Sequence, residues 1–103
     1  IFDPLARQMA MAETFRLTTR LLVCAAHDLC GGRLLMIHEG GYAEFYTPFC
    51  GLAVMEELSG VETGVEDPFR SHLAKPVQQL QPHQAAVIDR AARLVDLIPV
   101  PRT

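Results

Sequence analysis

The sequence predicts an α/β protein, in which this chain supplies the end of a doubly wound parallel sheet. A continuous apolar segment, residues 33–38, lies between two stretches with helical spacing of apolar residues. Two glycines and a tyrosine, Gly40, Gly41 and Tyr42, follow it almost directly. In parallel sheets, groups that face a ligand lie in loops just beyond the carboxyl ends of buried strands. We therefore expect the order helix, buried strand, glycine loop, helix.

The first helix is predicted over residues 13–30. Its apolar positions recur every three or four residues, as they do along one face of an amphipathic helix. They are Phe15, Thr18, Leu22, Ala25 and Leu29. Arg16 and Arg20 lie four residues apart on another face, which we expect to be solvated. Gly31 and Gly32 should end the helix, because glycine readily adopts the left-handed conformation of a helix C cap.

The second helix is predicted to follow the glycine loop. Residues 34–37 are apolar without alternation, which is typical of a strand that is covered on both faces. A helical pattern then runs over residues 43–58 and is stopped by Gly60. Pro48 offers an alternative helix start, with residues 43–47 as an irregular approach. Three aromatic residues are expected in the core: Phe45, Tyr46 and Phe49.

The residues after the second helix have patterns that predict two further helices. Residues 67–74 favour a short helix that Lys75 and Pro76 break, and residues 81–98 favour a longer one with Pro82 in its first turn. This last helix has an apolar stripe that would serve as a lid on the sheet or as a subunit contact. The stripe consists of Val87, Ile88, Ala91, Leu94, Val95 and Ile98.

Only residues 33–38 have the pattern of a buried strand. A single strand cannot satisfy its own backbone donors and acceptors, and even an isolated pair of strands is marginal. The simplest interpretation is that the 103 residues are a piece of a larger α/β protein whose other strands come earlier in the chain.

The composition excludes several classes of function. Half of the residues are apolar and 20% are charged, as in a globular core. Nine basic residues against twelve acidic ones give a net charge of −3, which argues against nucleic acid or an anionic membrane as partner. Three cysteines without metal-type spacing indicate free, buried thiols in a reducing compartment. Without a signal peptide or a membrane-spanning stretch, the predicted location is cytoplasmic.

The residues around the glycine loop carry the candidate chemistry. The phenol of Tyr42 could donate a hydrogen bond to a substrate oxygen that gains charge during a reaction. We expect the Glu39 carboxylate to accept backbone donors and shape the loop rather than act as a general base. His38 is expected to be a hydrogen-bonded structural residue rather than a metal ligand. Glu56, Glu57 and the acidic residues 62–67 are interpreted as solvated surface.

Several of these stretches resemble the arginase–deacetylase superfamily. The matching elements are Asp3-Pro4-Leu5-Ala6-Arg7 before a helix, Gly31-Gly32-Arg33 after it, Glu39-Gly40-Gly41-Tyr42, and residues 48–58. Together they cover about residues 2–68. The chain looks most like the bacterial class II histone deacetylase-like amidohydrolases and the acetylpolyamine amidohydrolases.

The resemblance implies a zinc-dependent deacetylase with a three-layer α/β/α fold, of which residues 1–103 form the carboxyl-terminal portion of a single catalytic domain. Its substrate would be acetyl-lysine or an acetylpolyamine. Tyr42 would be the catalytic tyrosine, and Gly40, Gly41 and Leu5 would line the acyl-lysine tunnel. The Zn²⁺ would be bound by residues outside this chain, so the chain holds no metal ligand and Asp3 is structural.

By the same resemblance, the partners are an acetylated amine and the rest of the deacetylase domain. A homo-oligomer of the full enzyme is left open, and the piece alone should be inactive. The alternative is a noncatalytic helical interaction module, in which Gly-Gly-Tyr is only a structural turn. Phosphate binding by the glycine loop is disfavoured, because the loop lacks the longer glycine pattern and a nearby lysine.

Overall fold

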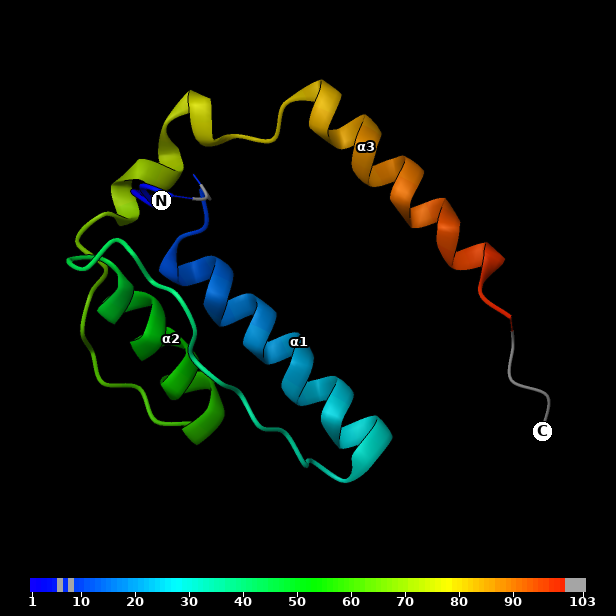
Figure 1. Ribbon diagram of the computed structural model, residues 1–103, viewed down its shortest axis with the longest axis horizontal. Coiled ribbons are helices and arrows are strands. Elements are labelled where there is room, and N and C mark those ends of the chain that lie inside the picture. The colour runs from blue at the N-terminus through cyan, green and yellow to red at the C-terminus, as the bar shows by residue number, and fades with distance from the viewer. Residues whose placement is uncertain (6, 8, 100–103) are drawn as a thin grey trace. The chain divides into compact units, whose positions relative to one another are not determined.

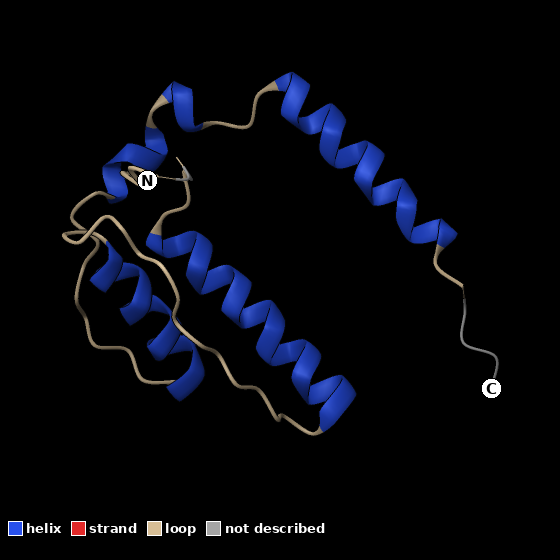
Figure 2. Cartoon of the chain, viewed as in Figure 1, coloured by secondary structure: helices blue, strands red, loops and turns tan. Residues whose placement is uncertain are grey.

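The computed structural model describes residues 1–5, 7 and 9–99 (Figure 1). The chain divides into two compact units, Ile1–Asp67 and Pro68–Thr103. Every regular element in the described residues is a helix (Figure 2).

Helix α1 spans Ala12–Cys30, so the predicted helix is confirmed to within one residue. At its start, the Met11 amide donates to the Thr14 hydroxyl over 3.3 Å. At its end, Gly31 has a φ of 63° and the Gly32 amide donates to the Ala26 carbonyl over 2.9 Å. This is the left-handed closure by which glycine satisfies the last carbonyls of a helix.

Helix α2 spans Thr47–Ser59 and has Pro48 in its first turn. The helix therefore begins one residue before the proline, close to the alternative prediction, and not at Ala43. Gly60 ends it with a φ of 70°, and the Gly60 amide donates to the Glu56 carbonyl over 2.8 Å. Helices α1 and α2 pack side by side (Figure 1).

The apolar stripe of α1 is not the face that the helix buries. The buried residues of α1 are the small Ala12, Thr19 and Ala26, whereas Phe15 and Leu22 of the stripe are exposed. The buried face of α1 is the one that packs against α2, whose own buried residues are Cys50, Ala53 and Glu56. Small side chains let two helices approach closely, and the large apolar side chains of α1 are left on its outer side.

The predicted α/β class was wrong. Residues 33–38 form no strand, and the described residues contain no β-ladder; the segment is part of the loop that joins α1 to α2 (Figure 2). The three-layer parallel sheet implied by the resemblance is likewise not seen. The physical reason is that a strand needs a neighbouring strand to pair with its backbone, and the described residues provide none. Leu35 is consequently 83% exposed despite its apolar side chain.

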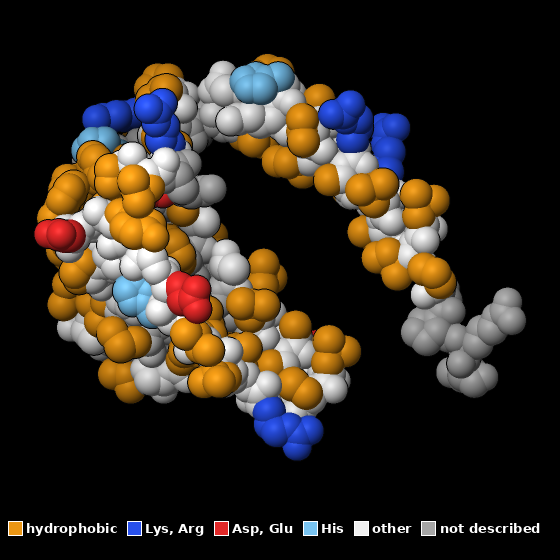
Figure 3. Space-filling view, viewed as in Figure 1, with side chains coloured by type: hydrophobic (Ala, Val, Ile, Leu, Met, Phe, Trp, Pro, Cys, Tyr) orange, Lys and Arg blue, Asp and Glu red, His pale blue; other side chains and the backbone are white. Residues whose placement is uncertain are grey.

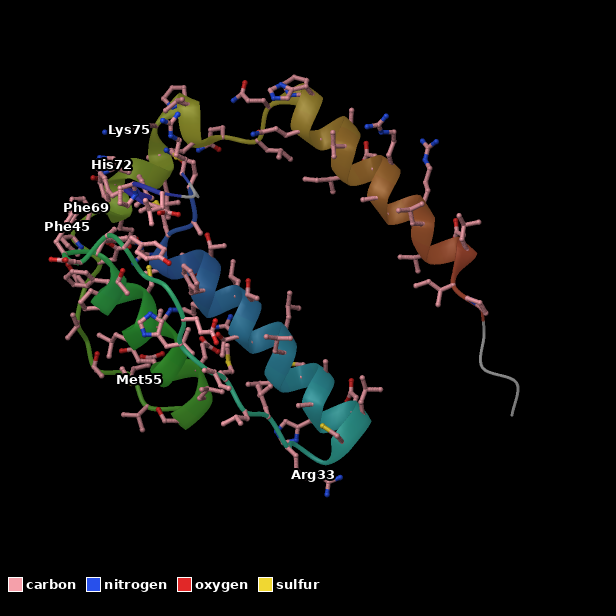
Figure 4. All side chains as sticks on the ribbon, in the orientation of Figure 1. Arg33, Phe45, Met55, Phe69, His72 and Lys75 are labelled. Carbon is pink, nitrogen blue, oxygen red and sulfur yellow. The ribbon has the colours of Figure 1, made fainter. Side chains whose placement is uncertain are left out.

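Two of the three aromatic residues expected in the core are at least partly buried. Tyr46 is fully buried and Phe49 is half-buried, with their ring centroids 6.1 Å apart. Phe45 is exposed, so its predicted core position was wrong. Its ring instead lies against that of Phe2, at a centroid separation of 5.2 Å. Figure 4 labels Phe45 in the loop that precedes α2.

The second unit consists of short helical turns and one longer helix. The 3₁₀ turns η1 (Arg70–Ala74) and η2 (Pro76–Gln78) flank Lys75, where the predicted break is confirmed. Helix α3 (Pro82–Ala92) continues into the 3₁₀ turn η3 (Arg93–Leu97), close to the helix predicted over residues 81–98.

None of the described residues of α3 or η3 is buried. The apolar side chains predicted to form a stripe there are visible as an orange band along the helix (Figure 3). Their role as a lid or a subunit contact stays a prediction. None of the helices in the described ranges combines the length and the apolar character needed to cross a bilayer.

Candidate active-site loop

Tyr42 lies in the loop that leads into α2. Its side chain is 57% exposed, and within the described residues its hydroxyl makes no hydrogen bond. A tyrosine with a structural role generally has a partner for its hydroxyl when it is buried. The phenol of Tyr42 is instead available to an acceptor from outside the unit.

The two glycines before Tyr42 both have left-handed backbones. The φ angles are 73° at Gly40 and 89° at Gly41, a region in which residues with a side chain are strained. A Cβ atom added at Gly40 would lie 3.5 Å from the Tyr42 ring, which is ordinary van der Waals contact. The glycine requirement at position 40 is therefore one of backbone conformation.

Position 41 requires glycine for a second reason, because there is no room for a side chain. An added Cβ would lie 2.6 Å from the Thr47 Cγ2 methyl and 2.9 Å from His38 Nε2. Real Cβ atoms essentially never come within 3.0 Å of another heavy atom. The side chains of His38 and Thr47 therefore close in on the backbone immediately before Tyr42.

A tight turn connects this loop to α2. The Tyr46 and Thr47 amides each donate to the Ala43 carbonyl over 2.8 Å. The Thr47 hydroxyl donates to the same carbonyl over 3.0 Å. The first residue of α2 is thus bonded to the residue that directly follows Tyr42.

Tyr46 is the structural tyrosine of the unit. Its hydroxyl accepts a hydrogen bond from the Ala12 amide over 2.9 Å and donates one to the Asp67 carboxylate over 2.7 Å. Burial raises the pKa of Tyr46 well above its usual range, and the hydrogen bond to Asp67 raises that pKa further. The sequence predicted that Tyr46 is buried, but it gave no signal for partners 34 and 21 residues away.

Glu56 joins the helices through a hydrogen-bonded ion pair, so its predicted solvated position was wrong. Its side chain is only 7% exposed. It accepts hydrogen bonds from the Thr63 hydroxyl over 2.5 Å and the Thr63 amide over 2.8 Å, and it pairs with Arg16. Hydrogen bonds from the Thr63 hydroxyl, Arg16 and the Thr63 amide lower the pKa of Glu56 to about 2.

A second ion pair lies on the same interface. Arg20 binds both carboxylate oxygens of Glu57, over 2.6 Å and 3.1 Å. Arg16 also reaches Glu57, over 3.6 Å. The hydrogen bond from Arg20 lowers the pKa of Glu57. The two arginines predicted to be solvated therefore pair with the two glutamates predicted to be solvated, because α1 and α2 bring these faces together.

Leu5 belongs to the segment before α1. Its side chain is 67% exposed, and its amide donates to the Asp3 side chain over 3.0 Å. This local hydrogen bond, typical of aspartate in turns, agrees with a structural Asp3. A tunnel wall formed by Leu5 stays a prediction. Ala6, within the same matching stretch, lies outside the described residues.

The described residues do not fit a zinc site. No group of three or more His, Cys, Asp or Glu side chains in this part of the chain is arranged to hold a metal ion. The three cysteines are free, as expected, but only Cys50 is buried, while Cys30 is partly exposed and Cys24 is exposed. The prediction of buried thiols was therefore wrong for Cys24.

The chain is similar in sequence to a histone deacetylase-like amidohydrolase and to a histone deacetylase. It is 49% identical over 87 residues to a histone deacetylase-like amidohydrolase of Pseudomonas aeruginosa, which covers 84% of this chain and 22% of the relative. It is 34% identical over 68 residues to histone deacetylase 8 of Arabidopsis thaliana, covering 65% of this chain and 18% of the relative. No protein-family model matches the chain.

These matches place the chain in the class of deacetylases. Within that class it belongs to the histone deacetylase-like amidohydrolases, and the family resemblance predicted from the sequence is confirmed. The chain spans about a fifth of the length of the curated relatives that it matches.

Proposed function

We propose that the complete protein hydrolyses an acetylated amine, acetyl-lysine or acetylpolyamine, and that Tyr42 is its catalytic tyrosine. The exposed Tyr42 hydroxyl, unpaired within the described residues and held directly after two left-handed glycines, carries this proposal. The kinship with amidohydrolases supplies the class of reaction.

The chemistry proposed for Tyr42 is stabilisation of an oxyanion. When water adds to the acetyl carbonyl carbon, a C–O bond forms and the carbonyl oxygen becomes negatively charged. The Tyr42 hydroxyl donates a hydrogen bond to that oxygen, which is a stronger acceptor than the original carbonyl. Both protons of the water pass to the nitrogen as the C–N bond breaks, which releases acetate and the protonated amine. Removal of one such donor typically slows a reaction by about 10²–10³-fold.

The neighbouring residues would shape the path to this hydroxyl. Gly40 and Gly41 would form part of a narrow tunnel, in which any side chain would obstruct the substrate. Leu5 would offer an apolar surface to the methylene chain of a lysine or a polyamine. Both assignments rest on the family resemblance and on the exposed positions of these residues.

The described residues hold no cluster that fits a zinc ion, so the chemistry of this chain rests on Tyr42. In this proposal, any zinc would be held by ligands outside this chain. The proposed cytoplasmic location rests on the free thiols and stays untested.

A chimera tests the proposal directly. The matched segment of the Pseudomonas aeruginosa relative is replaced by the corresponding residues of this chain, and hydrolysis of an acetyl-lysine fluorogenic peptide and of an acetylpolyamine is measured. We expect Tyr42→Phe to lower kcat by about 10²–10³-fold. Phe45→Leu, at a similarly exposed aromatic residue nearby, is the control and should retain most activity. Full activity of the Tyr42→Phe chimera would exclude the catalytic role.

The 103-residue chain by itself provides a second test. With zinc and the same peptide it should show no turnover, because its described residues lack a metal-binding cluster. Turnover that depends on Tyr42 would contradict this expectation.

The helical architecture favours one alternative, a noncatalytic interaction module. In support of it, α1 and α2 pack together without a sheet, and α3 exposes an apolar face. Thermal unfolding of the isolated chain, followed by circular dichroism, separates the two. A cooperative transition favours a self-sufficient module, whereas a weakly cooperative, aggregating chain favours part of a larger enzyme.

A further inference from the structure

We propose that His38 and Thr47 are positioning residues that clamp Gly41 between them and thereby fix the direction in which Tyr42 leaves the backbone. The clamp is inferred from the two side chains that a Cβ added at Gly41 would meet. Its consequence for catalysis rests on the proposed function of Tyr42.

The enclosure of Gly41 sets it apart from other left-handed glycines in the described residues. Three of these have open space where a Cβ would be, with no heavy atom within 4 Å: Gly31, Gly60 and Gly64. At Gly41, in contrast, Thr47 and His38 atoms lie 2.6 Å and 2.9 Å from that position. The two side chains come from either side of Gly41 in the sequence, His38 from the loop and Thr47 from the first residue of α2.

Thr47 is a stiff element of this clamp. It is β-branched, which restricts its side-chain torsion, and its hydroxyl bond to the Ala43 carbonyl over 3.0 Å fixes the rotamer. Directly before it, Tyr46 is anchored to the Ala12 amide and the Asp67 carboxylate. The Thr47 methyl that faces Gly41 is therefore held by the helix and its anchor.

A fixed Gly41 would restrict the neighbouring Tyr42. Glycine is the residue with the greatest backbone freedom, and two of them in succession would otherwise leave the tyrosine poorly directed. With Gly41 held, the freedom of Tyr42 is largely that of its own side-chain torsions. Such positioning matters for rate, because a displacement of about 1 Å can cost about 10²-fold.

A matched pair of substitutions separates the methyl group of Thr47 from its hydroxyl. Thr47→Ser keeps the hydroxyl that bonds Ala43 and removes the methyl that faces Gly41. Thr47→Val keeps a methyl there and removes the hydroxyl. In the chimera, we expect Thr47→Ser and His38→Ala to lower kcat about tenfold or more, with KM changed by less than about twofold. Thr47→Val should stay close to the parent chimera.

A second measurement needs no activity. Backbone ¹⁵N relaxation of the chimera, with ¹⁵N confined to the grafted residues, reports the order parameters of Gly41 and Tyr42. In the parent chimera both should be near the rigid value of about 0.85, and in the Thr47→Ser, His38→Ala double variant they should approach about 0.6. Amides within α1, such as that of Thr19, should not change, which shows that the variant remains folded.

The outcomes distinguish the clamp from the proposed function. If Tyr42→Phe leaves the chimera fully active, or the chimera has no activity, the relaxation data alone decide on the clamp. If Tyr42→Phe abolishes activity while the two clamp substitutions change neither kcat nor the order parameters, the clamp is wrong. Lower order parameters together with a selective loss of kcat would support both.

Discussion

The Tyr46 hydroxyl donates a hydrogen bond to the Asp67 carboxylate over 2.7 Å and joins residues that lie 21 positions apart. The same oxygen accepts the Ala12 amide at the start of α1. The buried Tyr46 side chain, directly before α2, thus links Ala12 at the start of α1 to Asp67 at the end of the unit.

Replacing Tyr46 with phenylalanine should destabilise the unit. The ring would still fill its site, but the Ala12 amide and the Asp67 carboxylate would each lose a partner. A buried hydrogen bond to a charged group contributes about 1.5–3 kcal/mol, and we expect a loss of that size. Urea unfolding monitored by circular dichroism measures it. Tyr42→Phe is the control and should change stability by less than about 0.5 kcal/mol, because its hydroxyl is exposed. Equal effects of the two substitutions would contradict the anchoring role of Tyr46.

The ion pair of Glu56 predicts a pH dependence of stability. The folded pKa of Glu56 is about 2, below its ordinary value of 4.5, so the unfolded chain takes up a proton at a higher pH than the folded chain does. The stabilisation by Glu56 is therefore complete above about pH 4.5 and is lost as the pH falls towards 2.

Urea unfolding at a series of pH values from about 6 down to about 2 tests this dependence, because that range includes both the unfolded and the folded pKa of Glu56. The Glu56→Gln variant should be less stable near neutral pH, and its stability should fall less steeply as the pH is lowered. Glu44→Gln, at an exposed glutamate, should follow the parent chain. An unchanged slope for Glu56→Gln would show that the carboxylate is not stabilised in the folded state.

Substitution of Gly41 by alanine should cost more stability than the same change at Gly31. Both glycines have left-handed backbones, which cost a residue with a side chain about 1–2 kcal/mol. At Gly31 the new methyl would meet open space, whereas at Gly41 it would collide with Thr47 and His38. Chemical unfolding of the two variants compares them. Restoration of stability to Gly41→Ala by adding Thr47→Ser would identify the Thr47 methyl as the obstacle, and equal costs at the two positions would argue against the collision.

The cysteines should differ in reactivity towards a thiol reagent such as 5,5′-dithiobis(2-nitrobenzoic acid). Cys24 is exposed and should react first. Cys50 is buried, and burial raises the pKa of its thiol, so that less of the reactive thiolate forms. Cys50 should react only as the chain unfolds. The Cys24→Ser variant should lose the fast phase, and a fast phase that remains in it would contradict the assignment.

The helix ends could be predicted because their signals are local. Gly31 and Gly60 adopt left-handed conformations at the ends of α1 and α2, and Pro48 lies in the first turn of α2. The conformational preferences of glycine and proline act within a few residues and need no distant partner. The family could be recognised for a similar reason, because the resemblance rests on several short stretches of sequence, of which the glycine–tyrosine loop is one.

The packing between the helices could not be predicted in the same way. The large apolar residues of α1, such as Phe15 and Leu22, suggested one buried face, but α2 covers the face of Ala12, Thr19 and Ala26. The partners of Tyr46 and Glu56 likewise lie far away along the chain. The clamp on Gly41 was missed because it depends on the space between two side chains, for which the sequence contains no signal.

The sequence by itself determined where the helices end, and it placed Tyr42 after two glycines at the entry to α2. Only the tertiary structure decided which faces of α1 and α2 meet, that their charged residues pair, and that residues 33–38 remain a loop. The physical reason is the range of the interactions: caps and turns are formed by neighbouring residues, whereas burial, ion pairing between helices and strand pairing depend on groups that only folding brings together.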